Sequence, residues 1–305
     1  FKPVTYKSLY FVYRRTIMEQ IIYAEKTDGI SIDRIRRDAA FSMPRKHLHN
    51  EYEIYYLLEG ERYYFIDRRT CHVTGGSLVF IDRNQIHQTS QAGPCSHERI
   101  LISLDPSPFS EFLSSTGEMS LPGFFRCHSG ILTLDTEEQV LAECLLDDAA
   151  KELHEKKTGF RHMAMSNLSR LFILAQRHMS GSSPSPVLPL STQPKHRKVD
   201  EVASYIIGHY DNRLSLEMIA DHFYVNKCYL SRIFKEVSGF TVNEYINMIR
   251  IRRARELLSG SSMSITEVSE SVGYENITYF ERVFNQYTQT SPSRYRKQYW
   301  LKNDF

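Results

Sequence analysis

Three residues near position 50 could bind a metal ion. His47, His49 and Glu53 are separated from one another by even numbers of residues. In a regular β-strand, residues at even spacing point to the same face, so all three side chains would lie together. Imidazole nitrogens and a carboxylate are ligands for divalent ions such as Zn, Ni, Mn or Fe. This segment is therefore a candidate metal site.

A second group of chemically useful side chains lies on two helical segments in the last third of the chain. In each segment three apolar residues recur at helical spacing, as Leu230, Ile233 and Phe234 do in the first of them. The opposite faces are free to enter a DNA major groove, and Arg232 and Arg282 could each bind guanine through two hydrogen bonds. The candidate DNA-contacting residues are Cys228, Ser231, Arg232, Lys235, Ile277, Thr278, Glu281, Arg282 and Asn285.

These two segments are parts of a repeated unit. The pattern from Leu214 to Tyr245 recurs from Met263 to Tyr295, offset by about 49 residues before a tight turn and about 50 after it. The unit has the proportions of a helix-turn-helix. Between the copies, Val242 to Leu258 has the apolar spacing of one rigid connecting helix that carries four arginines.

Capping residues support the same division into helices. Ser264 with Glu267 forms a capping-box pattern, and Gly273 can take the left-handed backbone of a turn that the first copy fills with Tyr224. The residues expected to cap the four helices are Ser215, Asn226, Ser264 and Asn276.

The motifs of residues 199–305 resemble the DNA-binding domain of the AraC/XylS family of transcriptional regulators. The resemblance depends on Tyr229-Leu230-Ser231-Arg232-Ile233-Phe234-Lys235 with Gly239, Ile249-Arg250-Ile251-Arg252-Arg253-Ala254, Val272-Gly273-Tyr274 and Ser291-Pro292-Ser293-Arg294-Tyr295-Arg296. It implies double-stranded DNA and RNA polymerase as partners. Thr288-Gln289 stands where the family usually has a glycine, which leaves the shape of that turn open.

The N-terminal part contains several short strands. Glu53 to Leu58, Arg62 to Asp67, Cys71 to Val73, Ser77 to Ile81 and Arg99 to Leu104 favour a double-sheet jelly roll or small barrel. His47-Leu48-His49, Glu53, Gly60, Gly76 and His87 resemble the two motifs of the cupin fold, although Asp82-Arg83-Asn84 replaces the expected Pro-x-Gly turn. The resemblance adds His87 to the candidate metal ligands. Alternatively, these residues line a sugar pocket.

A helical hairpin follows the strands. Thr136 to Lys156 carries Val140, Leu141, Cys144, Leu145, Ala149 and Leu153 on one stripe, and Phe160 to His178 carries Ala164, Leu168, Leu171, Phe172 and Ala175. The hairpin could pack against its own strands, form a dimer face, or do both. The resemblance supports a homodimer.

Composition and linkers divide the chain into two domains. We expect a cupin-like effector-binding and dimerisation domain over residues 1–179, a Ser- and Pro-rich linker over 180–198 and an AraC-type domain over 199–305. The net charge is only +2, and residues 199–305 contain equal numbers of basic and acidic residues, so bulk charge does not by itself indicate DNA binding. Five cysteines without paired spacing suggest reduced thiols in the cytoplasm, and no apolar run is long enough to span a membrane.

Two classes of function are compatible with these features. The first is a ligand-responsive transcriptional regulator, an activator of a carbohydrate utilisation operon, which binds a sugar as effector. The second is a metal-dependent cupin enzyme, an oxygenase or isomerase, with an appended DNA-binding domain. The duplicated DNA-reading unit favours the regulator, and no residue is assigned a catalytic role. Five tyrosines could stack on a sugar or could instead belong to the hydrophobic core. They are Tyr52, Tyr55, Tyr56, Tyr63 and Tyr64.

Overall fold

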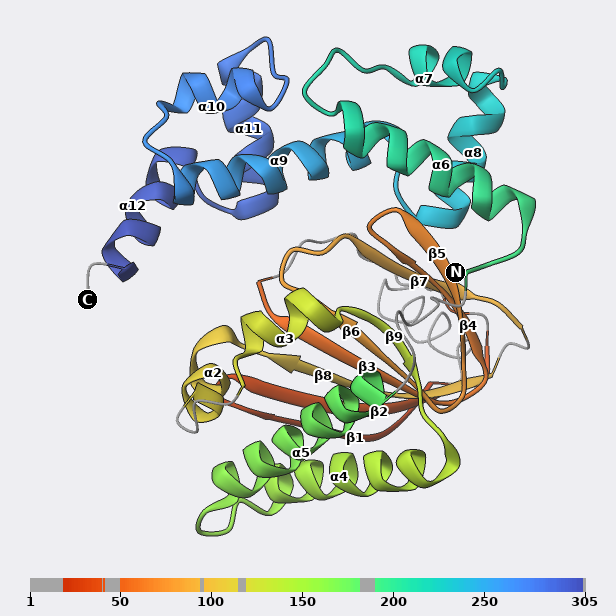
Figure 1. Cartoon of the computed structure of the whole chain (residues 1–305), viewed down its shortest axis with the longest axis vertical. Coiled ribbons are helices and arrows are strands. Elements are labelled where there is room, and N and C mark those ends of the chain that lie inside the picture. The colour runs from red at the N-terminus through yellow and green to blue at the C-terminus, as the bar shows by residue number, and fades with distance from the viewer. Residues whose placement is uncertain are drawn as a thin grey trace, which may run out of the picture. The chain divides into compact units, whose positions relative to one another are not determined.

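In the computed structural model of the chain (Figure 1), residues 19–39, 41, 50–93, 96–114, 119–181 and 190–303 are described. The chain forms two compact units, the second of which consists mainly of residues from Thr192 onward. The first unit is rich in antiparallel strands and the second is helical, as the sequence predicts. None of the described helices is long and apolar enough to cross a bilayer.

The strands of the first unit form two antiparallel sheets. The larger sheet has the order β1-β2-β8-β3-β6-β9 and the smaller has the order β5-β4-β7. This arrangement agrees with the predicted double-sheet architecture, although the described strands form two separate ladders and not one closed barrel. The strands are β1 Glu19–Thr27, β2 Ile30–Arg37, β3 Tyr52–Glu59, β4 Glu61–Ile66, β5 Arg69–Thr74, β6 Ser77–Ile81, β7 His87–Gln91, β8 His97–Leu104 and β9 Gly130–Thr133.

Five of these strands, β3, β4, β5, β6 and β8, were delimited from the sequence, whereas β1, β2, β7 and β9 were not. The sequence of β7, His-Gln-Thr-Ser-Gln, has no aromatic or aliphatic residue, and β2 contains four charged residues among its eight. β7 therefore lacks the apolar signal by which strands are recognised, whereas in β2 the charged residues interrupt the alternation that Ile30 and Ile32 begin. β1 lies at the edge of the larger sheet, where Ile21 and Ile22 are exposed.

Alternate residues of β3 face two different environments. Tyr52, Ile54 and Tyr56 lie in the hydrophobic core that the larger sheet shares with the helices, and the ring of Tyr52 stacks on Phe125 at 4.4 Å between centroids. Side chains of opposite parity, beginning with Glu53, point to the other face of the sheet. That second face contacts residues of the smaller sheet.

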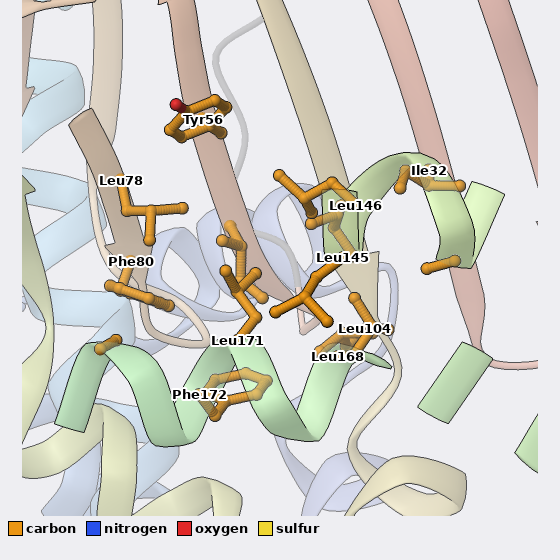
Figure 2. Close-up of a cluster of buried hydrophobic side chains, with 14 of the residues drawn as sticks. Ile32, Tyr56, Leu78, Phe80, Leu104, Leu145, Leu146, Leu168, Leu171 and Phe172 are labelled. Atoms are coloured by element: carbon orange, nitrogen blue, oxygen red, sulfur yellow. The ribbon is translucent and has the colours of Figure 1, made fainter. Parts of the chain in front are cut away.

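Helices cover the core side of the larger sheet. Leu145, Leu146, Leu168, Leu171 and Phe172 converge on strand residues such as Leu78 and Phe80 (Figure 2). The helical hairpin is therefore partly explained by packing against its own sheet. The helices are α2 Pro106–Ser114, α3 Leu121–His128, α4 Thr136–Glu155 and α5 Phe160–Gly181.

The buried stripe of α4 differs from the predicted one. Leu145, Ala149 and Leu153 are buried as expected, together with Ala142, Leu146 and Ala150. The other three residues of the predicted stripe, Val140, Leu141 and Cys144, are exposed, Val140 by 61%, so only part of the stripe packs against the sheet. These three residues lie in the first half of α4, on the side that faces away from the sheet. All five residues predicted to be buried on α5 are buried.

The second unit contains seven helices among its described residues. They are α6 Pro194–His209, α7 Leu216–His222, α8 Lys227–Ser238, α9 Val242–Gly260, α10 Ile265–Ser271, α11 Ile277–Thr288 and α12 Pro292–Asn303. The first helix pair is α7 with α8, and the second helix pair is α10 with α11. The connecting helix α9 packs against α6 and α8 at one end and against α10, α11 and α12 at the other (Figure 1).

The predicted caps and turns of this unit are confirmed. Ser215 and Ser264 accept hydrogen bonds from the backbone N–H of the third residue of α7 and α10, and Glu267 completes the capping box. Tyr224 and Gly273 occupy equivalent turn positions with φ of 53° and 88°. Asn226 and Asn276 accept from the first turns of α8 and α11.

The turn at Thr288-Gln289, left open by the sequence, closes without a glycine. Gln289 has φ of 57° and caps the end of α11, as Gly239 with φ of 77° caps the end of α8. The two copies therefore end their second helices in the same left-handed conformation.

Candidate functional site

The helices α8 and α11 present similar amphipathic surfaces. Leu230, Ile233 and Phe234 are buried, and so are their counterparts Phe280, Val283 and Phe284. The residues predicted to contact DNA are exposed on the opposite faces, except Ser231, which is half-buried. Each helix thus packs through one face and leaves the other accessible to a partner.

A shallow groove follows the exposed face of α8. Four of the predicted residues, Cys228, Ser231, Arg232 and Lys235, line it. The other residues that line it are Leu216, Lys227 and Glu236. The structure therefore brings the whole predicted set of the first copy onto one surface.

Each candidate guanine-binding arginine lies over a tyrosine one turn earlier on the same helix. The guanidinium carbon of Arg232 is 5.8 Å from the ring centre of Tyr229, and that of Arg282 is 5.1 Å from the ring centre of Tyr279. Such cation–π contacts restrict the arginine side chain and leave its N–H groups available. Neither arginine forms an ion pair with any described residue.

Tyr229 and Tyr279 were not predicted as site residues. The signal was present, since both copies carry the spacing Tyr-x-x-Arg, and residues three apart are neighbours on a helix. Both tyrosines are partly exposed, each by 42%. They therefore belong to the same surface as the arginines and are not core residues.

The two exposed faces differ in charge. α8 carries Lys227, Arg232 and Lys235, and only Lys227 of these forms an ion pair in the described chain, with Glu217 at 3.1 Å. α11 carries Arg282 with Glu281 beside it and no other charged residue. The exposed face of α8 therefore carries more basic side chains than that of α11.

The candidate metal ligands are only partly defined in the structure. Glu53 on β3 and His87 on β7 are both buried, and Glu53 Oε2 lies 3.6 Å from His87 Nε2. His87 Nδ1 donates a hydrogen bond to the carbonyl of Gln85 at 2.9 Å, which directs Nε2 toward Glu53. His47 and His49 lie outside the described residues. Two of the four predicted ligands are thus adjacent, and they come from the two different sheets.

Other polar side chains share the space between the sheets. The rings of Tyr55 on β3 and Tyr64 on β4 meet edge to face at 5.1 Å, and both hydroxyls are buried without a hydrogen-bond partner among the described residues. Burial raises the pKa of both tyrosines. Arg62 is almost fully buried, and it donates to Thr89 Oγ1 at 3.1 Å and to the carbonyl of Phe41 at 2.8 Å. Burial lowers the pKa of Arg62.

The five tyrosines considered for sugar stacking do not form one group. Tyr52 and Tyr56 belong to the hydrophobic core, where Tyr56 donates to Glu143 Oε1 at 2.8 Å. Tyr63 is half-buried beside His72. Only Tyr55 and Tyr64 lie with the polar residues between the sheets, because strand parity separates them from their neighbours.

Comparison with known proteins assigns both units. Residues 29–172 match the family model of the AraC-like ligand binding domain, and residues 219–298 match that of a helix-turn-helix domain. The chain is similar to the melibiose operon regulatory protein of Escherichia coli K12, at 25% identity over 264 residues that cover 84% of each chain. It is also similar to the Msm operon regulatory protein of Streptococcus mutans, at 25% identity over 254 residues, 82% of this chain and 86% of the relative.

Among solved structures, ToxT from Vibrio cholerae matches 89% of this chain and 98% of its own, with a TM-score of 0.36 and 15% identity. The two matched models together account for the sheet-rich unit and for most of the helical unit. The relatives that extend over both units are regulatory proteins. The chain belongs to the AraC family of transcriptional regulators.

Proposed function

We propose that this regulator activates a carbohydrate utilisation operon and that its effector is a sugar bound between the two sheets of the first unit. The observation that carries the proposal is the pair of buried hydroxyls of Tyr55 and Tyr64, which have no hydrogen-bond partner in the described part of the chain. Leaving buried polar atoms unpaired costs roughly 1–3 kcal/mol each, so such atoms suggest a missing partner.

A sugar matches the polar groups that surround these hydroxyls. Its hydroxyl groups both donate and accept hydrogen bonds, as tyrosine hydroxyls do, and they can also accept from the guanidinium of Arg62. The names of the melibiose and Msm operon regulators indicate relatives of the same regulatory type. These relatives are regulators, so we propose no catalytic activity for the chain.

We expect the substitution Tyr64→Phe to weaken sugar binding. Neutral mono- and disaccharides, melibiose among them, would be tested by their effect on thermal unfolding and on binding to the operator. Loss of one hydrogen bond to a bound sugar should weaken the active sugar about 5–100-fold. The matched control is Tyr63→Phe, which removes the neighbouring, half-buried hydroxyl and should leave the response unchanged. A sugar response that survives Tyr64→Phe at full strength would contradict this site.

We also propose that the first unit holds a divalent metal ion. Glu53 and the oriented imidazole of His87 support this assignment, because a buried carboxylate and a histidine held by a backbone carbonyl are the usual components of such sites. His47 and His49 would supply the remaining ligands. When bound, the ion would contribute a fixed positive charge between the sheets that could orient the effector.

Protein purified without chelator is expected to contain about one divalent ion per chain by elemental analysis. His87→Ala and His49→Ala should each abolish that content, whereas His72→Ala is the control, since His72 pairs with Glu61 at 2.9 Å outside the proposed site. Helical content of the second unit should be unchanged in all three. If the protein contains no stoichiometric metal after expression in supplemented medium, the metal proposal is wrong. Glu53 and His87 would then only line the sugar site.

A homodimer is the assembly that we propose for the full chain. The exposed apolar residues Val140 and Leu141, with Cys144, lie together in the first half of α4, and a helix hairpin with such a surface can pair with a second copy.

RNA polymerase is the further partner that an activator requires. The proposed place of action is the cytoplasm, where bacterial DNA is located.

A further inference from the structure

Arg250 lies near the middle of α9 and contacts both the segment that leads into the first helix pair and the turn of the second. Its Nε donates to the carbonyl of Tyr210 and its Nη2 donates to the carbonyl of Asn212, each at 2.8 Å. Tyr210 and Asn212 precede α7, so these two bonds hold the entry to the first helix pair. The two N–H groups of one planar guanidinium donate to two carbonyls in fixed directions, whereas the donors of a lysine ammonium lie on a single rotatable nitrogen.

The same guanidinium contacts the turn of the second helix pair. Its central carbon is 5.1 Å from the ring centre of Tyr274, which lies between α10 and α11. Tyr274 is also attached to α9, since its hydroxyl donates to Asn247 Oδ1 at 3.0 Å. One side chain therefore connects the entry of the first pair, the connecting helix and the turn of the second pair.

The two segments that Arg250 connects also touch directly. Gly273 has φ of 88°, and a Cβ placed on it would lie 2.7 Å from the carbonyl oxygen of Asp211 and 2.8 Å from that of Tyr210. The turn of the second pair thus packs against the backbone that leads into the first pair. Any side chain at position 273 would force this contact open.

Arg250 is not explained by an ordinary ion pair. No carboxylate of the described residues pairs with it, and its exposure is intermediate. Burial lowers the pKa of its guanidinium. Because the guanidinium of Arg250 is partly removed from water, its contacts add little to the free energy of folding compared with a well-packed neutral side chain. Its hydrogen bonds do, however, fix the orientation of the two carbonyl groups that accept them.

We propose that Arg250 is a positioning residue that fixes the distance and rotation between α8 and α11, and so restricts the protein to DNA sites with one spacing between their two halves. The inference rests on the DNA-binding function of the family. Two helices that read successive major-groove turns must be about 34 Å apart along the duplex. One extra base pair between the half-sites moves the second by about 3.4 Å and rotates it by about 35°, which a rigid pair cannot follow.

The test is a selection from random DNA duplexes, performed in parallel with wild type, Arg250→Gln and Arg250→Lys. We expect wild type to select two short motifs at a single spacing, and both variants to select the same motifs at several spacings. In binding titrations, inserting one base pair should weaken wild type about tenfold or more and the variants less than about threefold. The lysine variant keeps the charge and the aliphatic stem, so it remains informative if the glutamine variant folds poorly.

Arg255→Gln is the matched control. Arg255 lies on the same helix and its Nε donates to the hydroxyl of Tyr295 at 3.1 Å, with its guanidinium 5.2 Å from that ring, but Tyr295 lies on α12, so these contacts do not link the two pairs. This variant should keep the single spacing. The proposal would be overturned if both Arg250 variants kept the single spacing, or if they lost one of the two motifs while the spacing stayed unchanged. Failure of wild type to select any motif would instead contradict the DNA-binding function.

Discussion

The full chain is expected to bind a DNA fragment with two operator sites about 10²–10⁴-fold more tightly than residues 192–305 alone. The reason is tethering: once one DNA-binding unit of a dimer is bound, the second is held at high effective concentration near the other site. On a fragment with one site, the two proteins should bind with similar affinity. The measurement is a titration of both proteins on both fragments at the same salt concentration, because binding to phosphates depends strongly on salt.

Substitutions on α4 separate dimerisation from DNA reading in the same experiment. Val140→Glu combined with Leu141→Glu places two charges on the exposed apolar surface and should give a monomer by sedimentation, with two-site affinity reduced to that of residues 192–305. Lys151→Glu changes the charge of an exposed residue on the same helix and should leave the dimer intact. A chain that sediments as a monomer at micromolar concentration, with or without DNA, would contradict the proposed dimer.

The helical unit could be predicted closely because its signals are local. A capping box such as Ser264 with Glu267 is complete within four residues, and the apolar periodicity of α8 is complete within one helix. The same is true of Gly273, whose turn conformation follows from the residue type. Duplication repeated the serine and asparagine caps and the apolar periodicity, and the repeat marked both copies as one structural unit.

The features that the sequence did not reveal depend on contacts between distant segments. The partners of Arg250 lie 38 and 40 residues away, and nothing in their types marks them, since they contribute backbone carbonyls. Similarly, periodicity placed Val140 and Leu145 on one stripe of α4, but only the folded structure shows that Leu145 is buried and Val140 is exposed. The bounds of the polar strand β7 could not be predicted because its sequence contains no aliphatic residue.

Replacing Arg232 or Arg282 with alanine is expected to weaken specific binding by about 1–3 kcal/mol and to relax base preference in one half of the site only. Each arginine is exposed, forms no ion pair with a described residue and is supported by a tyrosine one turn earlier, so its guanidinium can meet a guanine with little loss of side-chain freedom. Selection from random duplexes with each variant would identify which half of the motif loses its preference.

The difference in charge between the two helices makes the two substitutions distinguishable. Arg232 lies among Lys227 and Lys235, whereas Arg282 is the only basic residue of α11. Lys235→Ala is therefore the control for charge alone. It should weaken binding to all DNA sequences about equally. The slope of log affinity against log salt concentration should fall by about the amount that one phosphate contact contributes. Tyr229→Leu and Tyr279→Leu should each reproduce part of the loss of the adjacent arginine, because the guanidinium would no longer be held over a ring. If Arg232→Ala and Arg282→Ala both retain wild-type affinity and base preference, these arginines do not read DNA, and α8 and α11 must contact it through other residues.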